Sequence, residues 1–319
     1  MSDPDVPQRF LDLAKQAAGQ GALTDTGLRE RFGEPGETEI HAGQVWRARW
    51  DQVSLLVLIL TVEDRDVVAA PVTVDPPVED RHCLVVDGSS TAFGVDATVW
   101  AGLATSVPVR VLERAIDAWN NDVVRWVSTT TEGSPEPVPA GARRGRGGES
   151  EFDPVASFRA ELTDDVESLQ QAPGLPAEAP GRTTPDLASL LGDQLDLTLL
   201  CSSLEMRQSE VMKFLRGKVP LTLEQINTVA QVTGLAAEKI AQTVRPLPFD
   251  LVVAAEHPRW RHAWHERARR QHTTEAEARL SGSYGAFALA ARETGGQGRD
   301  WNERLRRFLS DQELGPGGA

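Results

Sequence analysis

Residues 205–218 concentrate side chains that can hold or read a polyanion. A glutamine amide can form two hydrogen bonds with one adenine edge, and an arginine guanidinium can do the same with guanine. Lysine and arginine can also hold phosphate oxygens without reading the bases. The stretch is locally basic, although the whole chain has a formal net charge of −14. The candidate contact residues are Arg207, Gln208, Ser209, Met212, Lys213, Arg216 and Lys218.

Two short helices would place these side chains on one face. Within residues 197–216, LTLLCSSLEMRQSEVMKFLR, apolar residues fall where two packed helices bury side chains, and Cys201 is a small residue where the helices approach closely. Glu205 occupies the turn, at a position that commonly takes a left-handed backbone conformation, which costs a non-glycine residue on the order of 1 kcal/mol. The expected buried positions are Leu200, Leu204, Met206, Val211 and Phe214.

This pattern resembles the helix-turn-helix of the Cro/C1-type (XRE-like) transcriptional regulators. The resemblance continues past the motif, where Gly217 would close the second helix and Thr222 would begin the next. It implies a five-helix DNA-binding domain from about Pro185 to about Val244, with the second helix of the motif in the major groove. An ordinary helical hairpin fits the same apolar pattern. The residues expected to pack the following helix onto the pair are Leu223, Ile226, Val229, Ala230 and Val232.

The resemblance also implies roles for the candidate residues. Gln208 would pair with adenine, and Arg207 with guanine or a phosphate. The expected phosphate contacts, which position the protein without specifying a sequence, are Lys213, Arg216 and Lys218. Ser209 is either the N-terminal cap of the second helix or a phosphate donor.

Composition limits the remaining possibilities. The 319 residues suffice for two or three domains. Residues 1–130 contain twenty Asp and Glu and eleven Lys and Arg, which argues against a protein that coats nucleic acid through bulk charge.

Cys83 and Cys201 lack partners at ligand spacing, so we expect no metal, no disulfide and no cofactor. The sequence shows no signal peptide or membrane-length apolar run, so a cytoplasmic protein that does not enter the membrane is expected.

An N-terminal β domain is expected in residues 40–127. Alternating apolar runs predict strands in a meander, closed or nearly closed into a barrel and capped by a helix. Four tryptophans, Trp46, Trp50, Trp100 and Trp119, would lie in or near one core. The strands are expected at Gln44–Trp50, Ser54–Thr61, Val67–Val74 and His82–Val86, and the helical spacing involves Val111, Leu112, Ala115, Ile116 and Trp119.

The expected fold class is α+β and multidomain, with a barrel-like N-terminal domain and an all-α C-terminal half. The expected segments are 1–128 (a helix and the β sensor or interaction domain), 129–152 (a flexible linker), 153–184 (an amphipathic helix and linker), 185–245 (the helix-turn-helix domain) and 246–319 (a helical bundle). A palindromic site requires two-fold symmetry, so we expect a homodimer formed by the bundle or by Phe152–Gln171. Double-stranded DNA is the expected partner, and the N-terminal domain would bind a protein or a small ligand.

Other patterns have alternative interpretations. GQVWRARW and Thr73 resemble the MazF/PemK endoribonuclease barrel, but the long loop that presents that family's arginine is only Asp51-Gln52 here. We therefore expect that the protein is not an enzyme. The alternatives are such a ribonuclease or a protein-binding antitoxin or adaptor.

Arg144-Gly145-Arg146 resembles the core of an AT-hook, although a solubilising linker is favoured. His257, His262, His265 and Glu266 are expected to lie on a plain amphipathic helix.

Overall fold

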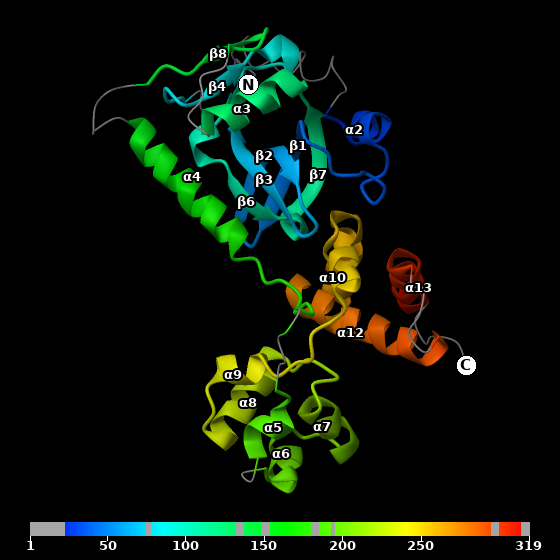
Figure 1. Ribbon diagram of the computed structural model, residues 1–319. Coiled ribbons are helices and arrows are strands. Elements are labelled where there is room, and N and C mark those ends of the chain that lie inside the picture. Colours follow the sequence, from blue (N-terminus) through cyan, green and yellow to red (C-terminus); the bar gives the residue numbers. More distant parts are fainter. Residues whose placement is uncertain are drawn as a thin grey trace, which may run out of the picture. The chain divides into compact units, whose positions relative to one another are not determined.

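The computed structural model describes residues 23–74, 78–131, 137–147, 154–179, 181, 185–192, 195–294 and 300–313. It divides into two compact units, residues 1–172 and 173–319, each with its own hydrophobic cores. The fold is α+β, with an antiparallel sheet in the first unit and helices in the second (Figure 1). Of the helical segment expected at residues 7–33, residues 7–22 lie outside the described residues, and Asp25–Phe32 form a helix. None of the described helices combines the length and apolarity needed to cross a bilayer.

The N-terminal unit is built on an eight-stranded antiparallel sheet. Its strand order is β7-β1-β2-β3-β5-β4-β8, and β6 pairs with β3. The strands are β1 (Gln44–Trp50), β2 (Val53–Val62), β3 (Asp66–Thr73), β4 (Leu84–Val86), β5 (Ala97–Val99), β6 (Thr105–Pro108), β7 (Leu112–Ala118) and β8 (Ala142–Arg144).

The sheet is open, so the expectation of a closed or nearly closed barrel is not met. β7 and β8 lie at opposite ends of the strand order, and no ladder joins them among the described residues. The central strand β2 reads VSLLVLILTV and is apolar on both faces. Such a strand is stable when both faces are covered by other elements, as in a layered fold.

Two helices and the loops between strands provide that cover. Side chains of α3 (Asn121–Thr131) join the core on one face, where Trp126 packs with Val45 and Leu58 of the sheet. On the other face, Leu169 of α4 (Pro154–Gln170) joins the core that contains Trp46. The short helix α2 (Asp25–Phe32) lies beside β7. The four tryptophans expected in one core are therefore divided among three clusters by the sheet itself.

Two sequence expectations for this unit were wrong. The helix expected at residues 111–119 is strand β7, and the helix begins only at Asn121. The expected linker, 129–152, contains the end of α3 and strand β8, which pairs with β4 through Leu84 and Arg144. The expected dimerisation helix, within Phe152–Gln171, places its stripe of Leu162, Val166 and Leu169 inside this unit.

The C-terminal unit contains two helical groups. The first comprises α5 (Leu187–Leu191), α6 (Leu197–Ser203), α7 (Gln208–Leu215), α8 (Leu223–Thr233) and α9 (Ala237–Ala241), which confirms the expectation of five helices between about 185 and 244. The second comprises α10 (Phe249–Glu256), α11 (Arg261–Gln271), α12 (Glu275–Thr294) and α13 (Trp301–Glu313). The helix α12 is continuous through Gly282, and this glycine lets Trp264 pack closely against the helix.

Asp117 is a buried carboxylate that ties the N-terminal unit together. It is 2% exposed and accepts hydrogen bonds from Arg31 Nη2 at 2.6 Å, the Ala92 N–H at 2.7 Å and Trp119 Nε1 at 2.8 Å. These donors come from α2, from the loop after β4 and from the loop after β7. One side chain therefore fixes three segments that are far apart in sequence.

We predict that Asp117→Ala lowers the free energy of unfolding of this unit by about 2–4 kcal/mol, because buried donors left without an acceptor cost about 1–3 kcal/mol each. The matched control is Asp25→Ala. Asp25 also receives an arginine, Arg114, but its side chain is 72% exposed, so we expect a loss below about 1 kcal/mol. Urea unfolding followed by tryptophan fluorescence measures both values. Equal losses for the two variants would contradict the role of Asp117.

Candidate nucleic-acid interface

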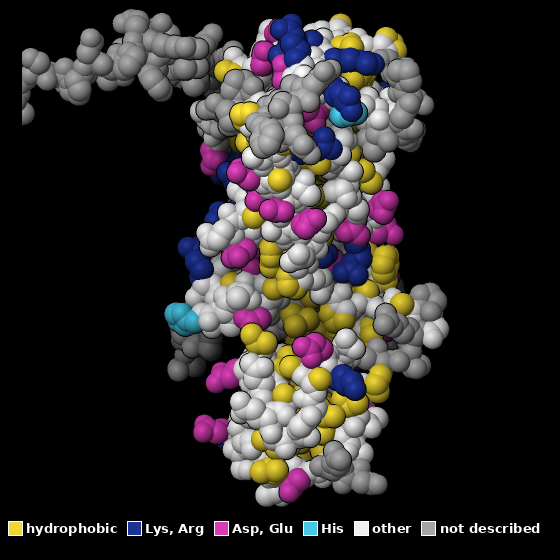
Figure 2. All heavy atoms as spheres, turned by 90° about the vertical axis from the view of Figure 1, so that its left-hand side faces the viewer, with side chains coloured by type: hydrophobic (Ala, Val, Ile, Leu, Met, Phe, Trp, Pro, Cys, Tyr) yellow, Lys and Arg dark blue, Asp and Glu magenta, His cyan; other side chains and the backbone are white. Residues whose placement is uncertain are grey.

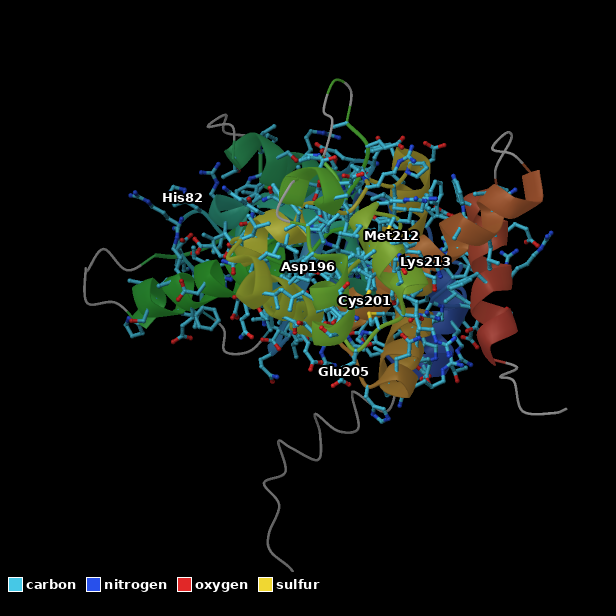
Figure 3. All side chains as sticks on the ribbon, turned by 90° about the horizontal axis from the view of Figure 1, so that it is seen from below. His82, Asp196, Cys201, Glu205, Met212 and Lys213 are labelled. Carbon is cyan, nitrogen blue, oxygen red and sulfur yellow. The ribbon has the colours of Figure 1, made fainter. Side chains whose placement is uncertain are left out.

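The helices α6 and α7 are joined by a four-residue turn, residues 204–207. Asp196 begins α6 by accepting a hydrogen bond from the Leu199 N–H at 3.0 Å. In the turn, Glu205 has a φ of 52°, and the Met206 N–H donates to the Cys201 carbonyl at 3.0 Å. Figure 3, viewed from below, shows Glu205 at the turn and Met212 and Lys213 on α7. The expected left-handed conformation of Glu205 is confirmed.

The apolar positions expected between the two helices pack together. Leu200, Val211 and Phe214 are buried in one cluster, which also includes Leu187 of α5. Cys201, Leu204 and Met206 pack against this cluster and are partly buried. The burial predicted for the pair is therefore confirmed, with the side chains nearest the turn less covered than those in the helices.

The opposite side of α7 carries the candidate contact residues. Those that are exposed are Arg207, Gln208, Ser209, Lys213, Arg216 and Lys218. Arg207 immediately precedes α7, Gln208 is its first residue, and Arg216 follows its last. Met212 differs from the rest, because it is half-buried and packs against the apolar cluster. The structure thus brings six of the seven predicted residues to the surface along one short helix and its ends.

Ser209 is not the cap of α7. The helix begins at Gln208, so Ser209 stands at its second position and Arg207 takes the capping position. The Glu210 carboxylate accepts a hydrogen bond from the Arg207 N–H at 3.3 Å and so satisfies one donor of the first turn. The other expected role of Ser209, a hydrogen bond from its hydroxyl to a phosphate, stays a prediction.

The end of α7 is fixed by a close backbone contact. Gly217 has a φ of 62°, and its N–H donates to the Phe214 carbonyl at 2.8 Å. A Cβ atom at this position would lie 2.7 Å from the Thr243 oxygen and 2.9 Å from the Arg245 nitrogen. The expected closure of the helix by Gly217 is confirmed. The close approach of the Thr243 and Arg245 backbone also explains why this position requires a glycine.

Arg245 is a cation beside α7 that the sequence did not indicate. Its N–H donates to the Gly217 carbonyl at 3.0 Å, and the residue is exposed. It follows α9 and lies 28 positions after Gly217, so only tertiary packing brings it to the end of α7. Its backbone carbonyl accepts a hydrogen bond from the Tyr284 hydroxyl of α12, and burial raises the pKa of that hydroxyl. The end of α7 is thereby tied to the second helical group.

The helix that follows begins where the sequence predicted. The Thr222 hydroxyl accepts from the Gln225 N–H at 3.2 Å, and the Gln225 side chain accepts from the Thr222 N–H at 2.9 Å. This reciprocal cap starts α8. In the predicted stripe, Val229 is buried and Ile226, Ala230 and Val232 pack against the cluster, whereas Leu223 is 66% exposed. Leu223 was therefore wrongly expected to be buried, because it is the first residue of the helix.

Acidic residues near the pair have structural roles of their own. Asp186 begins α5 by accepting hydrogen bonds from the hydroxyl and N–H of Ser189, which hold the pKa of that carboxyl below its usual value. Asp196 caps α6 and Glu210 caps α7 through the contacts described above. Glu205, by contrast, is exposed at the turn.

The residues that resembled a ribonuclease site are engaged in structural contacts. The Thr73 hydroxyl accepts a hydrogen bond from Trp100 Nε1 at 3.0 Å. Strands β1 and β2 are joined by the two-residue turn Asp51-Gln52, and Arg47 forms an ion pair with Glu113 of β7 at 2.7 Å.

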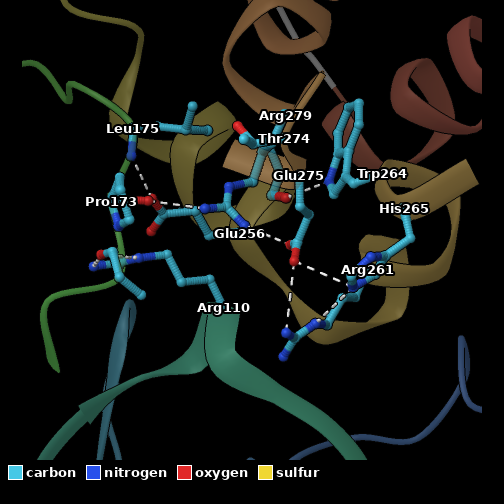
Figure 4. A network of polar contacts seen from close by, with 12 residues as sticks. Arg110, Pro173, Leu175, Glu256, Arg261, Trp264, His265, Thr274, Glu275 and Arg279 are labelled. Carbon is cyan, nitrogen blue, oxygen red and sulfur yellow. Dashed lines mark hydrogen bonds and ion pairs between the residues drawn. The ribbon is translucent and has the colours of Figure 1, made fainter. Parts of the chain in front are cut away.

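The histidines His257 and His265 of the C-terminal bundle have separate partners rather than gathering around one point. His257 Nδ1 accepts a hydrogen bond from the Arg259 N–H at 3.2 Å, and His265 lies 3.2 Å from a Glu275 oxygen. Figure 4 shows Glu275 between His265, Arg261 and Arg279. The described residues contain no group of three His, Cys, Asp or Glu side chains placed to hold a metal ion.

Comparison of the chain with protein-family models gives no match, and comparison with curated proteins gives none either.

We predict that Gly217→Ala lowers the free energy of unfolding of the five-helix group by about 2–4 kcal/mol. About 1 kcal/mol comes from a side chain in the left-handed region and the rest from the collision with the Thr243 and Arg245 backbone. Gly234→Ala is a matched control, because Gly234 has a φ of 71° but nothing lies within 4 Å of its added Cβ. It should cost only about 1 kcal/mol. Urea unfolding followed by circular dichroism measures both, and equal costs would refute the close contact.

Proposed function

We propose that this protein binds double-stranded DNA through α7 and regulates transcription from specific sites, as a regulator of the Cro/C1 (XRE-like) kind. The observation that carries the proposal is the two-sided character of α7. One side is buried with α5 and α6, while the other presents Gln208, Lys213 and the flanking arginines to solvent. A helix of this kind, preceded by a tight turn, fits the width of the major groove.

The two ends of α7 would contact different parts of the DNA. Gln208 and Arg207 stand at its beginning, which enters the groove first in this mode of binding. Their amide and guanidinium groups match the hydrogen-bonding edges of adenine and guanine. Lys213, Arg216 and Lys218 stand toward the other end and would hold phosphates, with Arg245 beside them.

The proposal includes a homodimer, since the acidic N-terminal part of the chain would repel DNA. Residues 1–130 carry an excess of nine acidic residues, so attraction must come from a local surface. Two copies of α7 on a palindromic site would double that local attraction. The stripe of α4 is used inside the N-terminal unit, which leaves the helices after residue 246 as the proposed dimerisation element. The N-terminal unit would meet a protein or a small ligand.

Selection of bound fragments from genomic DNA tests the function directly. We predict enrichment of a palindromic sequence whose affinity falls steeply with salt, because phosphate contacts release counterions. Gln208→Ala should weaken binding to the selected site by about 1–3 kcal/mol and relax the preference at one base pair. Lys239→Gln, which changes an exposed cation of α9, is the control and should leave affinity and preference unchanged. Absence of any enrichment over random DNA would refute the proposal.

Replacing the residue at the turn gives a second prediction. Glu205→Gly should raise the free energy of unfolding by about 1 kcal/mol, because it relieves the left-handed backbone, and should also tighten DNA binding by removing a negative charge. Glu205→Gln is the control that removes the charge but keeps the strained backbone. It should tighten binding without raising stability. Weaker DNA binding by both variants would contradict the placement of this turn near DNA.

A further inference from the structure

A cluster of basic side chains lies at one edge of the otherwise acidic N-terminal unit. Strand β8 is the last strand in the sheet order and carries Arg143 and Arg144, while Arg146 follows it. Arg81 and His82 come from the loop that precedes β4. We call these five residues the basic edge. In Figure 2, Lys and Arg side chains gather toward the top of the view, over this unit.

Backbone hydrogen bonds hold the segment around β8 against the segment around β4. The Gly145 N–H donates to the Cys83 carbonyl at 2.8 Å, which extends the pairing of β8 with β4. Gly145 and Gly147 pack directly on Asp80 and Arg81, with no room for a side chain between them. These contacts explain why Gly145 and Gly147 are glycines. They also give the arginines a fixed support, which a solvated linker would lack.

Several of the arginines form no ion pair with a carboxylate among the described residues. Glu79 pairs with Arg143 at 2.6 Å, and Asp80 pairs with Arg159 of α4 at 2.7 Å. In the part of the chain that the structure describes, Arg81, Arg144 and Arg146 have no such ion pair. Arg144 lies over the Trp126 ring, 5.8 Å from its centre, a contact that orients the guanidinium while leaving the residue exposed. The edge therefore keeps a net positive charge.

We propose that the basic edge binds the phosphate backbone of double-stranded DNA, as a second contact besides α7. The inference rests on the proposed function, because it assigns the same ligand to another surface. One guanidinium group can form two parallel hydrogen bonds with the oxygens of a phosphate. Alternate residues of an extended chain lie on one face and repeat about every 6.6 Å. Arg144 and Arg146 have that alternate spacing. A regularly repeated anion fits such an edge better than an isolated carboxylate does.

The edge also explains how an acidic unit could remain close to DNA. Residues 1–130 would be repelled by phosphates over most of their surface. A local group of arginines offsets this repulsion at one place and so orients the unit. Since phosphates carry no sequence information, the contact should strengthen binding to all DNA sequences alike.

The test compares salt dependence among variants of the full chain. Arg144→Gln with Arg146→Gln removes two charges of the edge, and Arg81→Gln with Arg146→Gln removes two while leaving the contact between Arg144 and Trp126 intact. Arg29→Gln with Arg125→Gln is the control, because both are exposed cations of the same unit that pair locally with Asp25 and Asp122. Binding to a duplex is measured by fluorescence anisotropy from 50 to 200 mM salt, and circular dichroism verifies folding.

Each edge variant should reduce the slope of log affinity against log salt by about 2, with the same reduction on the selected site and on random duplex. The control pair should leave the slope unchanged. Unchanged slopes in both edge variants would overturn the inference, as would equal losses in the control pair. Edge variants that lose affinity for single-stranded RNA but not for duplex DNA would overturn it too.

The same measurements separate this inference from the proposed function. If α7 does not bind DNA, Arg207→Gln with Lys213→Gln will leave duplex binding unchanged while the edge variants still weaken it. If only the edge inference fails, the α7 variant will lose the selected site and the edge variants will match the wild type. The two proposals can therefore fail independently.

Discussion

The close contact between Gly217 and the backbone of Thr243 and Arg245 is the constraint on which the arrangement of α7 depends. A buried apolar side fixes how the helix packs, but it leaves the helix free to slide and rotate by small amounts. The Arg245 N–H donates to the Gly217 carbonyl at 3.0 Å, and this close approach leaves no room even for a Cβ atom. It closes α7, returns the chain from α9 to the same point, and thereby decides where Lys213, Arg216 and Arg245 stand relative to one another.

The five-helix group was predictable because its determinants are local. Caps such as Thr222, the spacing of Leu200, Val211 and Phe214, and the turn at Glu205 each involve residues a few positions apart. Six of the seven candidate contact residues could be placed at the surface for the same reason. Arg245 could not, since it reaches α7 only through packing across 28 residues. The partly buried position of Met212 also depends on neighbours that the local pattern does not include.

The N-terminal unit shows why the remainder was missed. In β7, residues 112 and 115 are buried at helical spacing, because the ladder with β1 shifts register twice and leaves extra residues in the strand. A bulged strand therefore mimics a helix in the sequence. Strand β8 has only three residues and lies in a stretch rich in glycine and arginine, and its order comes from pairing with β4. Composition alone could not distinguish such an edge strand from a linker.

The two ends of the five-helix group lie side by side. The Leu247 N–H donates to the Pro176 carbonyl at 2.8 Å, and the Glu178 N–H donates to the Leu247 carbonyl at 2.9 Å. Leu175, which precedes the group, already belongs to the core of the bundle that follows it. In architectural terms, the segment between residues 178 and 247 is an insertion within a helical bundle whose own chain begins before it and resumes after it. Domains joined in this way can be exchanged or removed between adjacent chain positions without cutting the host core. The bundle is therefore the frame, and the five-helix group is the part that a related chain could replace as one piece.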